Sequence, residues 1–258
     1  RKELHGSMDD QLIREFAEKL EYLRGLDKRR DEIRSLIDAQ EKLTDEINLA
    51  LDKAATLSEL EDIYRPYRPK RKTRASIAKE KGLEPLANDI LKQEKGFDPS
   101  KSAVDYIDEE KGVTSVEDAI QGAMDIIAEL VSDNAEIRKR IRNLTNANGV
   151  LVSVATDEEK DSVYKNYYDY KEPVKKIAGH RVLAVNRGEK EGFLKVSVET
   201  DSEKPLNSIF RAMITDKNQL CSDIIREACT DAYQRLIYPS IEREVRNELT
   251  EKAEDGAI

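Results

Sequence analysis

The sequence predicts a mainly α fold, an elongated multi-helix scaffold with a long N-terminal helix and one small two-stranded β element. First, apolar and charged side chains each make up 38% of the 258 residues, while glycine, proline and aromatic residues are scarce. That composition is typical of long amphipathic helices. Second, apolar residues recur at helical spacing along most of the chain. Third, only residues 150–156 and 193–200 alternate as β-strands do, and we expect these two to pair.

The N-terminal helical region is predicted over residues 1–94. Ser7 begins a Ser-x-x-Asp capping box, and the helix that follows should run to about residue 40. Thr44, Thr56 and Thr73 are placed to begin shorter helices. The long helix is predicted from apolar residues three, four or seven positions apart, namely Leu12, Phe16, Leu20, Leu23, Leu26, Ile33 and Ile37.

The rest of the chain divides into two segments. Residues 95–112 are acidic and interrupted by glycine, so we expect a linker or a loose helical segment there. Residues 113–258 are expected to form a central helical region that holds the small β element at about 150–200. Between the two strands, a helix is predicted to follow Gly179, and Pro239 should start or kink the last helix.

Positive charge is concentrated in the basic connector, YRPYRPKRKTRA, residues 64–75. Pro66 and Pro69 disfavour a helix, so an extended conformation is expected. Residues 64–82 carry eight Lys/Arg and one Glu, a net charge of +7, in a chain of net charge −9. The remainder therefore sums to −16, and such a chain repels a polyanion everywhere except at this patch. The candidate nucleic-acid-binding residues are Arg65, Arg68, Lys70, Arg71, Lys72 and Arg74.

Two interpretations of the basic connector remain open. Its side chains could neutralise nucleic-acid phosphates, with affinity gained from counterion release. Alternatively, the tyrosines and prolines anchor the segment and the arginines pair with the acidic body. Burial distinguishes the two: Arg68, Arg71 and Arg74 point outward without acidic partners in the first case, and bridge to carboxylates in the second.

Nothing else in the sequence indicates catalysis, so we expect no enzyme, metal site, cofactor or small-molecule substrate. The two histidines and two cysteines lack metal-ligand spacing, and no phosphate-binding glycine loop follows a strand. His180 with Arg181 could contact a phosphate, and the tyrosines at 164–170 could stack on bases, but local packing is the favoured interpretation of both. No apolar run is long enough to span a membrane. Cys221 and Cys229 fall in a helical pattern, which favours a reducing, cytoplasmic compartment.

Four segments resemble the bacterial Tex family of transcription accessory proteins. The clearest is LEDIYRPYRPKRKTRASIAKEKGLEPLA, residues 60–87, the signature segment of that family. The other three are RKELHGSMDDQLIREFAEKLEYLRGL at the N-terminus, GHRVLAVNRGEKEGFLKVSVE from Gly179, and DAYQRLIYPSIEREVRNELTEKAEDGAI from Asp231. The resemblance extends over essentially the whole chain, with residues 95–112 the least similar.

The resemblance implies an RNA-binding, multidomain cytoplasmic protein linked to transcription. Such proteins are similar to eukaryotic elongation factors of the Spt kind and carry an RNase H-like (YqgF-type) domain, helix-hairpin-helix elements and a C-terminal oligonucleotide-binding domain. This chain is then the helical region before the RNase H-like domain, a non-catalytic scaffold without the main RNA-binding module. The alternative is a protein-interaction scaffold that docks RNA polymerase or partner domains and contacts no nucleic acid itself.

Overall fold

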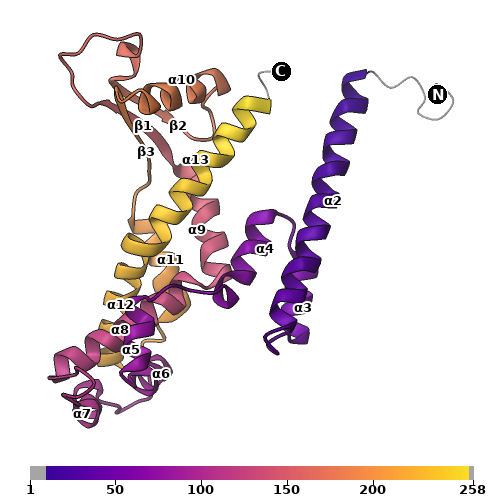
Figure 1. Cartoon of the computed structure of the whole chain (residues 1–258). Helices are drawn as coiled ribbons and strands as arrows, with labels where there is room; N and C mark the ends of the chain where they lie inside the picture. The colour runs from indigo at the N-terminus through magenta and orange to yellow at the C-terminus, as the bar shows by residue number, and fades with distance from the viewer. Residues whose placement is uncertain (1–9, 256–258) are drawn as a thin grey trace. The chain divides into compact units, whose positions relative to one another are not determined.

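A computed structural model of the protein describes residues 10–255, and these divide into two compact units, one up to Pro69 and the other from Lys70. Helices dominate both units, so the mainly α fold class is confirmed. The long N-terminal helix is also confirmed, as α2 (Asp10–Asp38). The cap predicted at Ser7 lies outside the described residues. Figure 1 shows the elements in chain order.

The first unit is a small helical cluster built on the C-terminal half of α2. Ile33 and Ile37 of α2 are fully buried against Leu51 and Leu60, as expected for residues on one helical face. The predicted caps are present, because the Thr44 and Thr56 hydroxyls accept hydrogen bonds from backbone amides three residues on. The other elements of this unit are α3 (Asp45–Lys53), α4 (Leu57–Tyr64) and a 3-10 turn (Arg65–Tyr67).

The N-terminal half of α2 continues the apolar stripe beyond the core of this unit. Leu12, Phe16 and Leu23 are 51%, 64% and 43% exposed, whereas Leu26 is 6% exposed and Ile33 is fully buried. The spacing that predicts the helix therefore holds along its length, but only its second half is covered by α3 and α4.

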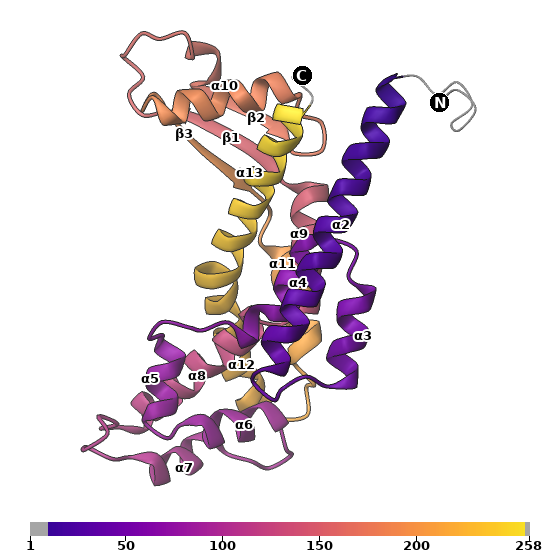
Figure 2. The same ribbon diagram turned by 45° about the vertical axis from the view of Figure 1, so that its right-hand side comes forward.

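The second unit surrounds α8 (Val116–Ser132), which packs against α5, α6 and α12. Ile127 and Val131 of α8 are fully buried in a large apolar core. Figure 2 shows these helices at one end of the unit and the sheet at the other. The remaining helices are α5 (Arg74–Glu80), α6 (Glu84–Lys92), α7 (Pro99–Ala103), α9 (Ala135–Asn148), α10 (Gly179–Lys190), α11 (Glu203–Met213), α12 (Gln219–Asp231) and α13 (Tyr238–Asp255), with 3-10 turns at Val104–Tyr106 and Lys165–Tyr167.

Residues 95–112, for which the sequence suggests a linker or loose helical segment, contain α7 and the 3-10 turn that follows it. Ala103 and Val113 are fully buried in the core of the second unit. Asp108 and Val113 form an isolated antiparallel bridge around a turn that includes Gly112, whose φ is +72°. Glycine adopts this left-handed backbone conformation easily because it has no Cβ.

The small β element has three strands rather than the two predicted. They are β1 (Val150–Ala155), β2 (Asp169–Pro173) and β3 (Leu194–Glu199), and β1 pairs antiparallel with both others in the order β2-β1-β3. The sequence reasoning missed β2 because its residues, DYKEP, are mostly charged and end in proline. Each is exposed or only half-buried, so no apolar alternation marks the strand.

Side chains from α10 and α13 form hydrogen bonds with the backbone groups on the outer edge of β3. The amides of Val196 and Val198 donate to carboxylates of Glu189 and Glu242, at 3.3 and 2.9 Å. The carbonyl of Val198 accepts from the Tyr238 hydroxyl at 2.6 Å, and that of Val196 accepts from an Arg246 guanidinium at 3.2 Å. These four bonds take the place of a fourth strand, which satisfies the edge of the sheet.

The last two long helices are joined by a π-helical turn at Ala232–Ile237. Pro239, predicted to start or kink the last helix, is the second residue of α13. Its nitrogen cannot donate to the preceding turn, and the widened π turn places the proline ring there without a break in the chain's helical path. The turn is well packed, since Ala232 and Ile237 are fully buried.

Glycine at position 188 lets α10 approach the sheet closely. A Cβ there would lie 2.5 Å from Cδ1 of Leu194 and 3.0 Å from the Tyr164 ring. We therefore expect Gly188→Ala to lower the free energy of unfolding by about 1–3 kcal/mol, although alanine favours a helix by ~1 kcal/mol. The matched control is Gly25→Ala in α2, where a Cβ meets nothing within 4 Å. Urea unfolding should show slight stabilisation for the control, and equal behaviour of the two variants would contradict the packing argument.

Candidate nucleic-acid interface

Both ends of the basic connector are fixed by the helices that flank it. Tyr64 is 8% exposed in the core of the first unit, and Tyr67 packs against the same core. Pro66 sits in the first turn of the 3-10 segment Arg65–Tyr67, so the extended conformation predicted for the whole connector begins only after Tyr67. The extended part ends at Thr73, whose hydroxyl and amide form a capping box at the start of α5.

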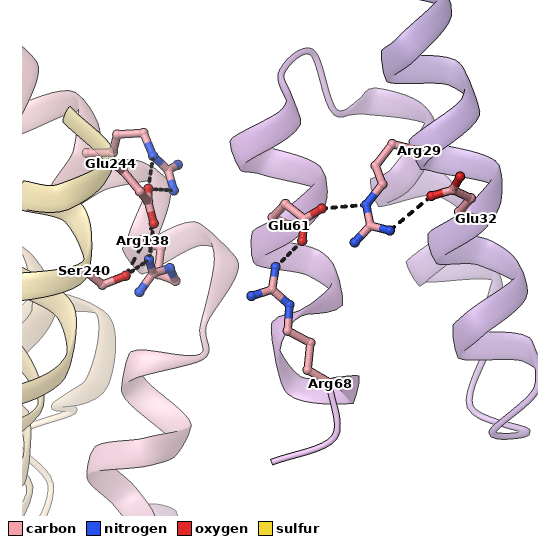
Figure 3. A network of polar contacts seen from close by, with 8 residues as sticks. Arg29, Glu32, Glu61, Arg68, Arg138, Ser240 and Glu244 are labelled. Carbon is pink, nitrogen blue, oxygen red and sulfur yellow. Dashed lines mark hydrogen bonds and ion pairs between the residues drawn. The ribbon is translucent and has the colours of Figure 1, made fainter. Parts of the chain in front are cut away.

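Arg68 is engaged by the first unit rather than turned to solvent. Its guanidinium pairs with Glu61, which also accepts from Nε of Arg29 at 2.6 Å, so Glu61 lies between two arginines (Figure 3). Both guanidinium groups lie over the Tyr64 ring, at 5.7 Å for Arg29 and 5.6 Å for Arg68. Burial opposes ionisation of Glu61, but the Arg29 hydrogen bond and the two positive charges outweigh it and lower the pKa of that carboxyl.

Lys70 and Arg65 also have partners. The Lys70 ammonium pairs with Asp133 and lies 3.7 Å from Glu129, which places it against the C-terminal turn of α8. Arg65 is half-buried and makes an interaction of its own. Three of the six candidate residues are therefore held by the protein.

Arg71, Lys72 and Arg74 are exposed, and they form the free cationic segment of the connector. The nearest acid to Lys72 is Glu80 at 3.7 Å, and both side chains are about two-thirds exposed, so this pair contributes little. Arg71 and Arg74 form no ion pair with any residue between 10 and 255. Burial thus divides the connector: Arg68 meets the criterion for internal pairing, and Arg71 meets the criterion for phosphate contact. Arg74 is exposed and forms no ion pair, but its charge acts on the nearby Asp125 carboxyl.

The two other candidate contacts are occupied by local packing. Arg181 donates to the Glu172 carboxylate at 2.9 Å, and the Tyr170 hydroxyl contacts the same carboxylate. Tyr164 is 6% exposed, and the Tyr168 hydroxyl contacts the backbone carbonyl of Lys160. Tyr164 is thus buried, and the half-buried Tyr168 and Tyr170 direct their hydroxyls to partners within the protein, which supports the packing interpretation.

Both cysteines lie buried in the core of the second unit. Burial raises the pKa of Cys229 to about 12 and also raises that of Cys221, so neither thiol is a nucleophile near neutral pH. Between residues 10 and 255, no cluster of three or more His, Cys, Asp or Glu side chains is arranged to hold a metal ion.

None of the helices in the described part of the chain combines the length and apolar character that a bilayer span requires.

The acidic partners of the connector were missed by sequence reasoning. Glu61 precedes Arg68 by only seven residues, but α4 ends at Tyr64 and Arg68 is extended, so helical spacing does not link the two. Glu129 and Asp133 are about sixty residues from Lys70, and nothing local in the sequence links them to it.

A family model and several relatives of known sequence match this chain. The family model described as Tex central region-like matches residues 94–258. The chain is 44% identical to the uncharacterized protein YdcI of Bacillus subtilis and 34% identical to the transcriptional accessory protein Tex of Neisseria gonorrhoeae. It is 28% identical to the human S1 RNA-binding domain-containing protein 1. Each alignment covers all of this chain but only 36%, 35% and 27% of the relative, so the chain spans about a third of the length of these proteins.

Proposed function

Since the chain belongs to the Tex central region-like family, we propose that it is a non-catalytic helical scaffold of a cytoplasmic transcription accessory protein that binds RNA as a whole. In this proposal the free cationic segment, Arg71, Lys72 and Arg74, contacts the phosphate backbone. The names of two relatives, a transcriptional accessory protein and an S1 RNA-binding domain-containing protein, support the assignment.

One observation carries the proposed contact. Three cations lie together on an exposed segment of a chain of net charge −9, and two of them have no ion pair with a described residue. Unpaired cations gain most from a phosphate, because no internal ion pair has to be broken. Within the second unit, the capping box at Thr73 fixes the backbone where the segment enters α5, which reduces the entropy lost on binding.

The test is fluorescence anisotropy of this chain with a short single-stranded RNA and a DNA duplex across a salt series. We expect Arg71→Glu/Lys72→Glu to weaken binding at least tenfold at low salt. Loss of two phosphate contacts should also reduce the salt slope by about 1.4 for the RNA and about 1.8 for the duplex. The control is Lys101→Glu/Lys217→Glu, two exposed lysines that receive the same change of charge elsewhere in the second unit.

Equal loss in both variants would indicate a general charge effect, and no binding by the wild-type chain at low salt would remove the proposed contact. The second outcome favours a protein-interaction scaffold. That alternative is supported by the internal pairing of Arg68 and Lys70 and by the exposed apolar residues in the N-terminal half of α2. Such residues are typical of a surface that another protein segment covers.

A further inference from the structure

A second concentration of positive charge lies in the second unit, between α9 and α11. These helices lie side by side in both views (Figures 1 and 2), and a hollow of about 470 Å³ opens between them. We call it the α9–α11 hollow, and its lining residues are Arg140, Leu144, Lys204, Asn207, Ser208 and Arg211. Three of the six are cationic, and no acidic side chain lines it.

Helical geometry brings these residues together. Lys204, Asn207, Ser208 and Arg211 follow one another at steps of three, one and three along α11, which places all four on one face. On α9, Arg140 and Leu144 are four residues apart and share a face as well. The opposite side of α11 is fixed in the core through Ile209, which is fully buried, so the cationic face is held toward α9.

The three cationic side chains of the hollow have no ion-pair partners among the described residues. Arg140, Lys204 and Arg211 are all exposed, and none forms an ion pair with a residue in the described part of the chain. Arg138 and Arg142, which lie two positions before and after Arg140 on α9, share the Glu244 carboxylate. The chain thus supplies a partner to the arginines on one face of α9 and leaves Arg140, on another face, open to solvent.

From this arrangement we propose that the α9–α11 hollow binds a phosphate group of a nucleic-acid backbone, as a site separate from the connector. Two guanidinium groups and one ammonium group supply the charge, and guanidinium groups match phosphate oxygens with paired hydrogen bonds. The Asn207 amide and Ser208 hydroxyl add neutral donors of the kind that commonly contact phosphate and sugar. Leu144 offers an apolar surface beside them for a sugar or base.

The test compares Arg140→Gln/Arg211→Gln with the wild-type chain, using a fluorescein-labelled twelve-nucleotide single-stranded RNA in a salt series. Glutamine keeps most of the length and polarity of arginine and removes the charge. We expect about tenfold weaker binding at low salt and a salt slope smaller by about 1. The control is Arg187→Gln/Arg243→Gln, which removes two exposed arginines that do not line the hollow. Circular dichroism and thermal unfolding verify that both variants fold.

A second measurement locates the ligand. Amide resonances of Asn207, Ser208 and Arg211 should shift when the RNA is added, and the shifts should disappear in Arg140→Gln/Arg211→Gln. Inorganic phosphate and a twelve-residue oligoglutamate are titrated in parallel. If phosphate shifts these resonances and the RNA does not displace it, the hollow is a site for free phosphate. If oligoglutamate binds more tightly than the RNA, the hollow takes an acidic protein partner. Either result overturns the proposal.

The experiment also separates this site from the proposed connector contact. If the hollow variant loses affinity while Arg71→Glu/Lys72→Glu does not, the hollow is the phosphate site and the connector contact is wrong. If the hollow variant binds RNA like the wild-type chain, the proposal for the hollow is wrong, whatever the connector variant does.

Discussion

Glu244→Gln should lower the free energy of unfolding of the second unit by about 3 kcal/mol, because the Glu244 carboxylate is an ion-pair partner of two buried arginines on α9. Its Oε1 accepts from Arg138 at 2.8 Å, and its Oε2 accepts from Nε and Nη2 of Arg142 at 3.0 and 2.8 Å. Figure 3 shows Glu244 on α13 facing Arg138, with Ser240 beside it. The Arg138 side chain is fully buried and that of Arg142 is 7% exposed, so water cannot replace the carboxylate.

Urea unfolding followed by circular dichroism measures this effect. The matched control is Glu251→Gln, which makes the same chemical change at an exposed position of α13. Surface substitutions of that kind usually change stability by less than about 0.5 kcal/mol. If Glu244→Gln is as stable as the control, the two arginines draw their stabilisation from other partners, and the link between α9 and α13 does not depend on this carboxylate.

Asn218→Ala should destabilise the same unit by about 3 kcal/mol, because one side chain satisfies three backbone groups. Its Oδ1 accepts from the Cys221 amide and caps α12, and its amide nitrogen donates to the carbonyls of Glu94 and Phe97 at 2.7 and 2.8 Å. Asn218 is 8% exposed. Loss of the cap costs about 1 kcal/mol, and each buried carbonyl left without a donor costs about 1 kcal/mol or more.

Asn218→Asp divides the two contributions. A carboxylate still accepts from the Cys221 amide and suits the N-terminus of α12, but it cannot donate to the two carbonyls. If the donors matter, Asn218→Asp should lose most of the stability that Asn218→Ala loses, and hydrogen exchange should become faster around Phe97. If Asn218→Asp is as stable as the wild-type chain, the hydrogen bonds from residue 218 to the carbonyls of Glu94 and Phe97 contribute little.

Helices were predictable because their signals are local. The spacing from Leu26 to Ile37 and the threonine caps at 44, 56 and 73 depend on neighbours within a few turns, and the structure has these features where the sequence indicates them. Strand β2 was not predictable from periodicity, since its pairing with β1 is sequence-distant and its side chains stay near solvent. Strand β2 forms because β1 offers backbone hydrogen-bond partners, and its own composition does not favour a strand.

For the candidate site, the sequence indicates a segment but not the partners of its individual side chains. Charge density located the connector, yet it could not distinguish Arg68, which pairs with Glu61, from Arg71, which has no such partner among described residues. That distinction depends on which carboxylates the fold brings close. The α9–α11 hollow carried no signal in the sequence, because Arg140 and Lys204 are far apart in the chain and meet only through the packing of two helices.

The closed edge of β3 has a consequence for how the protein behaves at high concentration. A strand from another molecule can add to β3 only by displacing Glu189, Glu242, Arg246 and Tyr238 from its backbone groups. At the opposite edge, β2 ends in Pro173 and carries Asp169 and Lys171, features that discourage intermolecular pairing. Neither side of the sheet is therefore a ready template for cross-β growth, so the small sheet can stay intact in a crowded solution without seeding aggregates.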